Sequence, residues 1–341
     1  MNLLNDILRS YRNIKSFQSF IKCAGVIIRS MAHFPEFTAS TINLLEKFCA
    51  LAKFQATSLM ASEFSIIIEV LKVHSKILSD EIVKRNECFN KIAACQDLAE
   101  LLDTAIRLSI DKNQPISFLA TQPIELSHTI NTLKHKAWKI LNRIMEVTLK
   151  EDIMNLPAYG ICASIIEDAI GFVINLCKHY YTAENGLEIS EDPKRILLDI
   201  ITFIKEAICI KEFKKIFIAA KEQLVLSLIF PLLRATKEEY EGMLKDADNF
   251  VNLAADTCDD HNSKIIKTEA AALLENICEE IDGTLTFVFD FSITLIQNAC
   301  SSLSNNASFF ASITPPAFLL DAAFTALAIV SYLTGKRPDL R

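Results

Sequence analysis

The stretch 64-FSIIIEVLKVHSKIL-78 carries the pattern that decides the fold of this chain. One stripe of residues recurs at the three- and four-residue steps of a single helix face: Ile67, Val70, Leu71, His74 and Leu78. The stretch therefore predicts an amphipathic helix with a histidine inside its apolar stripe.

The same periodicity returns along the whole chain, with breaks at plausible turns. We expect helices near residues 14–33, 40–55, 62–79, 87–110, 127–151, 157–183, 194–209, 211–234, 237–254, 263–281, 285–303 and 316–334. Paired in order, they make about six two-helix units of about 40–50 residues, the period of HEAT-type repeats. The sequence predicts an all-α fold, a right-handed α-solenoid of about six HEAT-like repeats.

Composition agrees with an elongated helical array. The 341 residues include only 7 Gly and 9 Pro, too few for the turns that sheets and Gly-rich nucleotide loops require. The apolar fraction of 51% fits helices buried on both sides by neighbouring repeats. A net charge of −7 favours a basic partner over nucleic acid.

We treat residues 1–341 as a single solenoid segment. Residues 1–110 hold the N-terminal repeats, 111–126 form a loop, and 127–341 hold the remaining repeats. The chain ends on 335-GKRPDLR-341 without a polar capping helix, so we expect a fragment of a longer array.

The ten cysteines are scattered through apolar helical runs and form no CxxC pair, so most are expected to be core residues in a reducing compartment. No signal-peptide layout opens the chain. The stretch 316-PAFLLDAAFTALAIVSYLTG-335 is long enough to span a membrane. Because Asp321 lies inside it, we expect a buried helix and no membrane insertion.

The sequence predicts no catalytic residues, cofactor or metal. GxSxG, GxxxxGK and GxGxxG motifs are all absent. The one metal-like spacing joins Cys258 to His261, and no second ligand pair accompanies it.

Residues 133–147 combine one tryptophan with a basic row. We expect Trp138 to pack between adjacent helices. Lys134, Lys136, Lys139 and Arg143 are interpreted as a solvated face rather than a nucleic-acid groove.

Acidic residues are concentrated in 236-TKEEYEGMLKDADNFVNLAADTCDDHNSKIIKTEAAALLENICEEIDG-283. Carboxylates at this density repel one another unless they are solvated or meet a cationic partner. Charge alone leaves two interpretations, a solvated helix face with a polar loop or an acidic docking surface for a basic protein.

The order of motifs in this region resembles the importin-β (karyopherin) family of nuclear transport receptors, in its large-importin or importin-α-exportin branch. The steps are 229-IFPLL-233, 236-TKEEYEGM-243, 246-DADNFV-251, 256-DTCDD-260 and 268-TEAAALL-274. Ala247 stands where the family has Pro, and Glu269 where it often has a basic residue. The helices at 134–144 and 318–333 also look like family helices, so the resemblance covers roughly residues 130–335.

The resemblance implies a binding protein without chemistry of its own. It would bind basic cargo and the small GTPase Ran on a concave acidic face, contact nucleoporin Phe-Gly repeats, and move between cytoplasm and nucleus through the nuclear pore. The residues expected to contact a partner are Glu238, Asp256, Asp259 and Asp260, with Phe250 and Leu274 as packing residues. An exportin of the same family, or a HEAT scaffold subunit of a multiprotein complex, is the alternative.

Overall fold

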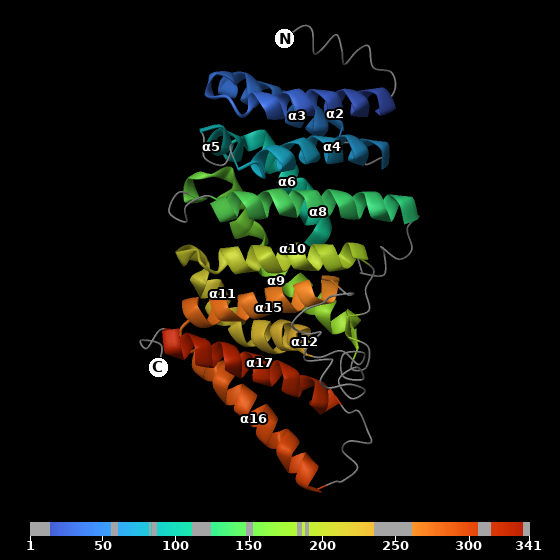
Figure 1. The fold of residues 1–341 in the computed structure, drawn as a ribbon. Helices are drawn as coiled ribbons and strands as arrows, with labels where there is room; N and C mark the ends of the chain where they lie inside the picture. Colours follow the sequence, from blue (N-terminus) through green and yellow to red (C-terminus); the bar gives the residue numbers. More distant parts are fainter. Residues whose placement is uncertain are drawn as a thin grey trace. The chain divides into compact units, whose positions relative to one another are not determined.

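The computed structural model describes residues 14–55, 61–81, 83, 87–110, 124–147, 153–182, 186–187, 191–234, 261–305 and 315–336. Almost all regular structure in these ranges is helical (Figure 1). The exception is a pair of two-residue antiparallel strands, β1 (Tyr181–Thr182) and β2 (Gly186–Leu187). The predicted all-α fold is confirmed.

The chain divides into two compact units, Met1–Ile165 and Ile166–Arg341, and the division falls inside α9 (Pro157–Tyr180). The α-helices of the first unit before α9 are α2 (Ile14–Met31), α3 (Thr38–Gln55), α4 (Ala61–Leu78), α5 (Glu87–Ala93), α6 (Gln96–Ile110) and α8 (Ile124–Val147). Those of the second unit after α9 are α10 (Glu191–Ala207), α11 (Lys214–Leu224), α12 (Phe230–Leu233), α15 (His261–Glu280), α16 (Thr284–Asn305) and α17 (Pro315–Lys336). Short 3₁₀ turns occupy Pro35–Phe37, Ile153–Asn155 and Lys211–Phe213.

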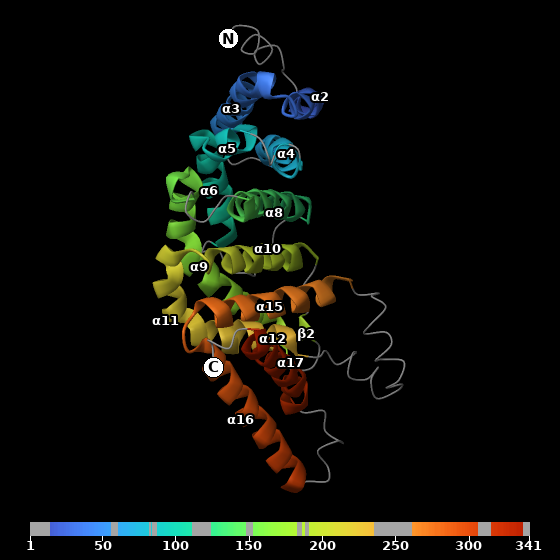
Figure 2. The same cartoon turned by 60° about the vertical axis from the view of Figure 1, so that its left-hand side comes forward.

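In the first unit, α4 packs between α2 and α8, and α3 packs against α4 and α6. Figure 2 shows α2, α4 and α8 on one side of this unit and α3 and α6 on the other. The predicted stripe of α4 faces the interior. All its members are buried: Ile67, Val70, Leu71, His74 and Leu78.

The single helix predicted at 87–110 is wrong, because α5 ends at Ala93 and α6 begins at Gln96. Between them, Cys95 accepts a hydrogen bond from the backbone N–H of Ala99 at 3.2 Å. The Cys95 sulfur accepts further bonds from the N–H groups of Asp97 and Leu98. Cys95 therefore caps the N-terminus of α6. The break between α5 and α6 is too short to disturb the apolar periodicity of the sequence.

In the second unit, α15 packs against α10, α12 and α17, and α16 packs against α17. Proline lies in the first turn of α17 and of α10: Pro315 is the first residue of α17, and Pro193 is in the first turn of α10. The first turn tolerates proline because its N–H groups have no partner within the helix.

The helix predicted at 211–234 contains a π turn, Val225–Ile229, between α11 and α12. Phe230 N–H bonds to the carbonyl of Val225, five residues back. Pro231 follows, and its ring would clash with a carbonyl four residues earlier in a regular α-helix. The wider π turn avoids this clash of the proline ring with the backbone carbonyl.

Among the described residues, two helical stretches have the length and hydropathy to cross a membrane, Pro157–Lys178 and Lys211–Leu233. In the first stretch, 56% of the most apolar segment is buried inside the protein, and in the second stretch 44% is buried. Core helices of folded domains pass the same test, so this is weak evidence for a membrane. The stretch 316–335 forms most of α17, in which Ala322 and Leu333 are buried while Asp321 and Phe324 are exposed.

Candidate interaction surface

The four acids expected to contact a partner, Glu238, Asp256, Asp259 and Asp260, lie outside the described residues, as do Phe250 and the helix predicted at 237–254. The structure does describe α15, which follows the last of these acids directly. Its side chains define what the acidic region offers within the folded unit.

One side of α15 is buried in the second unit. Its buried apolar residues recur at helical spacing: Ile266, Ala270, Leu273, Leu274 and Ile277. They face the neighbouring helices α10, α12 and α17. Leu274 was expected to be a packing residue, and its complete burial confirms this.

Two acids of α15 pair with lysines of the preceding helices. Lys205 Nζ in α10 lies 2.8 Å from Oε2 of Glu269. Lys214 Nζ in α11 lies 2.9 Å from Oε2 of Glu280. Both carboxylates are only partly exposed and join α15 to the preceding helices.

Two further bonds extend this contact. Asn276 donates its side-chain N–H to the Lys205 carbonyl at 3.3 Å. Lys221 donates to the Asp282 carbonyl at 3.4 Å, in the turn between α15 and α16. In that turn Gly283 has φ of 74°, a conformation that favours glycine. We call the contacts of Lys205, Lys214 and Lys221 with α15 and this turn the lysine seam.

Two carboxylates of α15 stay outside the lysine seam. Glu275 and Glu279 are half-exposed, and within the described part of the second unit neither forms an ion pair. They are the described acids nearest in sequence to 256-DTCDD-260 that remain open to an external cation.

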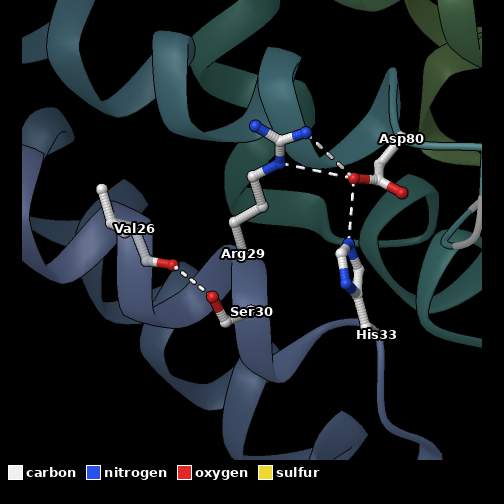
Figure 3. Close-up of polar contacts among 5 residues, drawn as sticks. All are labelled: Val26, Arg29, Ser30, His33 and Asp80. Carbon is white, nitrogen blue, oxygen red and sulfur yellow. Dashed lines mark hydrogen bonds and ion pairs between the residues drawn. The ribbon is translucent and has the colours of Figure 1, made fainter.

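A second polar cluster lies in the first unit (Figure 3). Asp80, just after α4, accepts hydrogen bonds at one oxygen from Arg29 Nη2 at 3.1 Å and His33 Nε2 at 2.9 Å. The Asp80 side chain is 9% exposed. A serine lies nearby, but Figure 3 shows the Ser30 hydroxyl turned toward the Val26 carbonyl, to which it donates at 3.2 Å.

This cluster lacks the contacts of a catalytic triad, which requires a nucleophile hydrogen-bonded to the histidine. Its geometry instead ties the end of α2 to the end of α4. We interpret Arg29, His33 and Asp80 as a structural link.

The basic row of α8 is only partly a solvated face. Lys139 is exposed as predicted, but Lys134 is 3% exposed. Arg143 donates to the Leu78 carbonyl at 3.4 Å and pairs with Glu81 at 3.6 Å, linking α8 to the end of α4. Packing of the aliphatic stem of lysine against apolar neighbours makes such burial possible. Trp138 is fully buried, which confirms its packing role.

No group of three His, Cys, Asp or Glu side chains is placed to hold a metal ion in the described ranges. Cys258 and the side chain of His261 lie outside them. The prediction of core cysteines is confirmed for five of the described thiols: Cys49, Cys88, Cys162, Cys177 and Cys278. Cys23 is exposed, and Cys95 and Cys209 are half-buried.

Comparison of the chain with known protein families, curated proteins and solved structures finds no match.

Proposed function

We propose that this chain is a nuclear transport receptor of the importin-β type, built as a right-handed α-solenoid of HEAT-like repeats. It binds Ran and basic cargo, carries protein through the nuclear pore by contacts with nucleoporin Phe-Gly repeats, and distributes between cytoplasm and nucleus. It uses no cofactor, performs no catalysis, and neither binds nucleic acid directly nor inserts into a membrane.

The observation that carries the proposal is the agreement between the family-like motifs and the helices of the second unit. The IFPLL step, 229–233, ends a helix at Leu233. The segment 268-TEAAALL-274 lies within α15, with Ala270, Leu273 and Leu274 fully buried. The resemblance predicts this arrangement: a helix end, an acidic connection, and then a helix with a small and apolar core.

The solenoid form is supported by the packing order inside each unit. Helix α4 contacts α2 and α8, and α15 contacts α10 and α17. Contacts between successive helices of one row are typical of stacked two-helix repeats.

The lysine seam limits which acids of the second unit can take part in the proposed binding surface. Glu269 and Glu280 are neutralised by Lys205 and Lys214. The acids proposed to attract basic cargo or Ran are therefore Glu238, Asp256, Asp259 and Asp260, continued by Glu275 and Glu279 on α15. Opposite charges across such a surface raise association rates at low salt.

The test is a pull-down of purified Ran by the full gene product. We expect Ran loaded with a non-hydrolysable GTP analogue to be retained at least about tenfold better than Ran loaded with GDP, because the two states of Ran must couple to cargo binding. Ran with the GTP analogue should also change the affinity for a Lys-rich cargo peptide. Retention of neither form by a folded protein would overturn the proposal. Peptide binding without Ran dependence would favour a HEAT scaffold subunit.

A further inference from the structure

The last described helix, α17, is apolar on every side. From Ala322 to Gly335 it carries no charged side chain. Its inner side is buried at Ala322, Ala326 and Val330, and the helix packs against α12, α15 and α16. A helix that is apolar all round is normally covered by protein on all sides. The outer side of α17 therefore has the composition of an interface.

The outer side carries one exposed row of side chains. Its members follow one another at steps of three and four residues, and all are exposed: Asp321, Phe324, Ala328, Tyr332 and Lys336. Phe324 is 58% exposed and Tyr332 is 57% exposed. Large apolar side chains that are exposed together mark interaction sites. We call these five residues the α17 stripe.

The α17 stripe is nearly symmetric about its middle. Ala328 lies seven residues after Asp321 and eight residues before Lys336. A negative charge therefore lies at one end and a positive charge at the other, each about 11 Å along the helix from the alanine. Phe324 and Tyr332 lie about one turn to either side of it. An acid, a ring, a small residue, a ring and a base in this order are complementary to a second copy that runs in the opposite direction.

The basic end of the stripe is held beside its aromatic residue. Nζ of Lys336 lies 5.4 Å from the centre of the Tyr332 ring, a cation–π contact. Lys336 cannot reach Asp321 of its own chain, because fifteen residues separate them, which is about 22 Å of helix. The opposite charges of the stripe can therefore meet only between two molecules.

We propose that this chain forms a homodimer in which the α17 stripes of two copies pack antiparallel about a two-fold axis at Ala328.

A two-fold axis requires that the same surface of both copies makes the interface. The two copies of Ala328 meet at the axis, where a small side chain lets two helices approach closely. Phe324 packs beside the partner's Tyr332, and Asp321 faces the partner's Lys336 at the rim. Each dimer therefore contains two ring contacts and two pairs of opposite charges, which fix the antiparallel direction.

The face of a single helix is a small interface. Stable complexes bury about 800 Å² on each partner, and ion pairs at an exposed rim contribute little. We therefore expect a weak dimer with a Kd of about 1–100 μM. The stripe contains none of the acids proposed to attract Ran or cargo, so the pairing does not depend on the proposed transport function.

The test is sedimentation equilibrium of the 341-residue chain. We expect the weight-average mass to rise from that of one chain toward that of two between about 1 and 100 μM. Ala328→Glu should raise the Kd at least about tenfold, because it brings two like charges together at the axis. Ala219→Glu is the matched control, since Ala219 is an exposed alanine of α11 outside the stripe. It should leave the Kd unchanged.

A charge swap tests the antiparallel direction. Asp321→Lys should raise the Kd roughly tenfold, because each dimer then has two repulsive pairs in place of two attractive ones. Adding Lys336→Asp should restore most of the lost affinity. The two residues are too far apart to pair within one chain, so this rescue requires contact between copies.

A chain that stays monomeric up to 100 μM would overturn the proposal and leave the outer side of α17 to a segment of the same chain. A dimer that Ala328→Glu does not weaken, or an Asp321→Lys loss that Lys336→Asp does not rescue, would also overturn it. A monomer that co-sediments with phosphatidylcholine vesicles, and loses them on Ala328→Glu, would assign the stripe to a lipid surface instead. Thermal melting by circular dichroism verifies folding. Phe324→Ser with Tyr332→Ser replaces Ala328→Glu if the glutamate variant unfolds, with the same expected rise in Kd.

Discussion

Gly25 in α2 lies so close to Val73 in α4 that a Cβ atom on Gly25 would stand 2.5 Å from Val73 Cγ2. Real Cβ atoms do not come this near to another carbon. Because a β-branched valine is held in few rotamers, it has little freedom to move aside. Glycine is therefore required here for the close packing of two helices.

Gly25→Ala should destabilise the protein by about 1–2 kcal/mol, because overpacking costs more than the helix propensity of alanine returns. Val73→Ala should relieve the clash, so the double variant should lose less than the sum of the single losses. Urea denaturation measures each free energy of unfolding. Gly160→Ala is the matched control: nothing lies within 4 Å of its added Cβ, and we expect a gain of about 0.5–1 kcal/mol. Equal effects at the two glycines would contradict this view of the α2–α4 contact.

The Lys205–Glu269 pair should matter more to stability than a surface pair. Its side chains are 21% and 28% exposed. Lys205→Met or Glu269→Gln should each cost about 1 kcal/mol of unfolding free energy, since one partly buried group loses its partner. The control is the pair of Lys91 and Glu87, with side chains 47% and 73% exposed. Its removal should change stability by less than about 0.5 kcal/mol. A double-mutant cycle with no coupling at Lys205 and Glu269 would reject this prediction.

His74 should make the folded state sensitive to mild acid. Its pKa is 6.5 in the unfolded chain and about 4 in the folded one. Between these values the unfolded state binds a proton that the folded state does not, so stability falls as pH drops through this window. We expect a loss of about 3 kcal/mol from pH 7 to pH 4 due to this residue. Urea denaturation at a series of pH values gives the free energy of unfolding of the wild type and of His74→Gln. The contribution of His74 is the part of the pH dependence that the variant lacks. Parallel stability curves for the two proteins would argue against it.

Reversing charge at Asp256, Asp259 and Asp260 tests the acidic surface. The triple change to lysine should weaken binding of a Lys-rich cargo peptide about tenfold or more at low salt and leave the melting temperature nearly unchanged. The control reverses three exposed acids, Glu212, Glu222 and Asp290, with the same change in net charge. It should weaken binding much less. A large drop in melting temperature for the first variant would mean that its aspartates are structural caps.

Helix positions could be predicted from the sequence to within a few residues. The expected helix at 40–55 is α3, Thr38–Gln55, and the one at 263–281 is α15, His261–Glu280. This works because burial on one side imposes a local period of 3.6 residues that remains visible in the letters.

Other features had no such signal. The end of α5 at Ala93 and the π turn at Val225–Ile229 leave the apolar pattern intact. The burial of Lys134 also escaped prediction, because a charged head on a long apolar stem fits either a surface or a core position. The candidate contacts Glu238, Asp256, Asp259 and Asp260 remain predictions, since they lie outside the described residues.

The sequence by itself determined the helical class, the approximate ranges of helices such as α3 and α15, and the packing role of Trp138 and Leu274. Each of these depends on neighbours a few positions away. Only the tertiary structure decided which side chains meet across helices. It paired Glu269 with Lys205, and it placed the Cys49 sulfur of α3 3.5 Å from Nε2 of His74 in α4. The physical reason is that such contacts depend on which helix faces pack together, and periodicity identifies a face but not its partner.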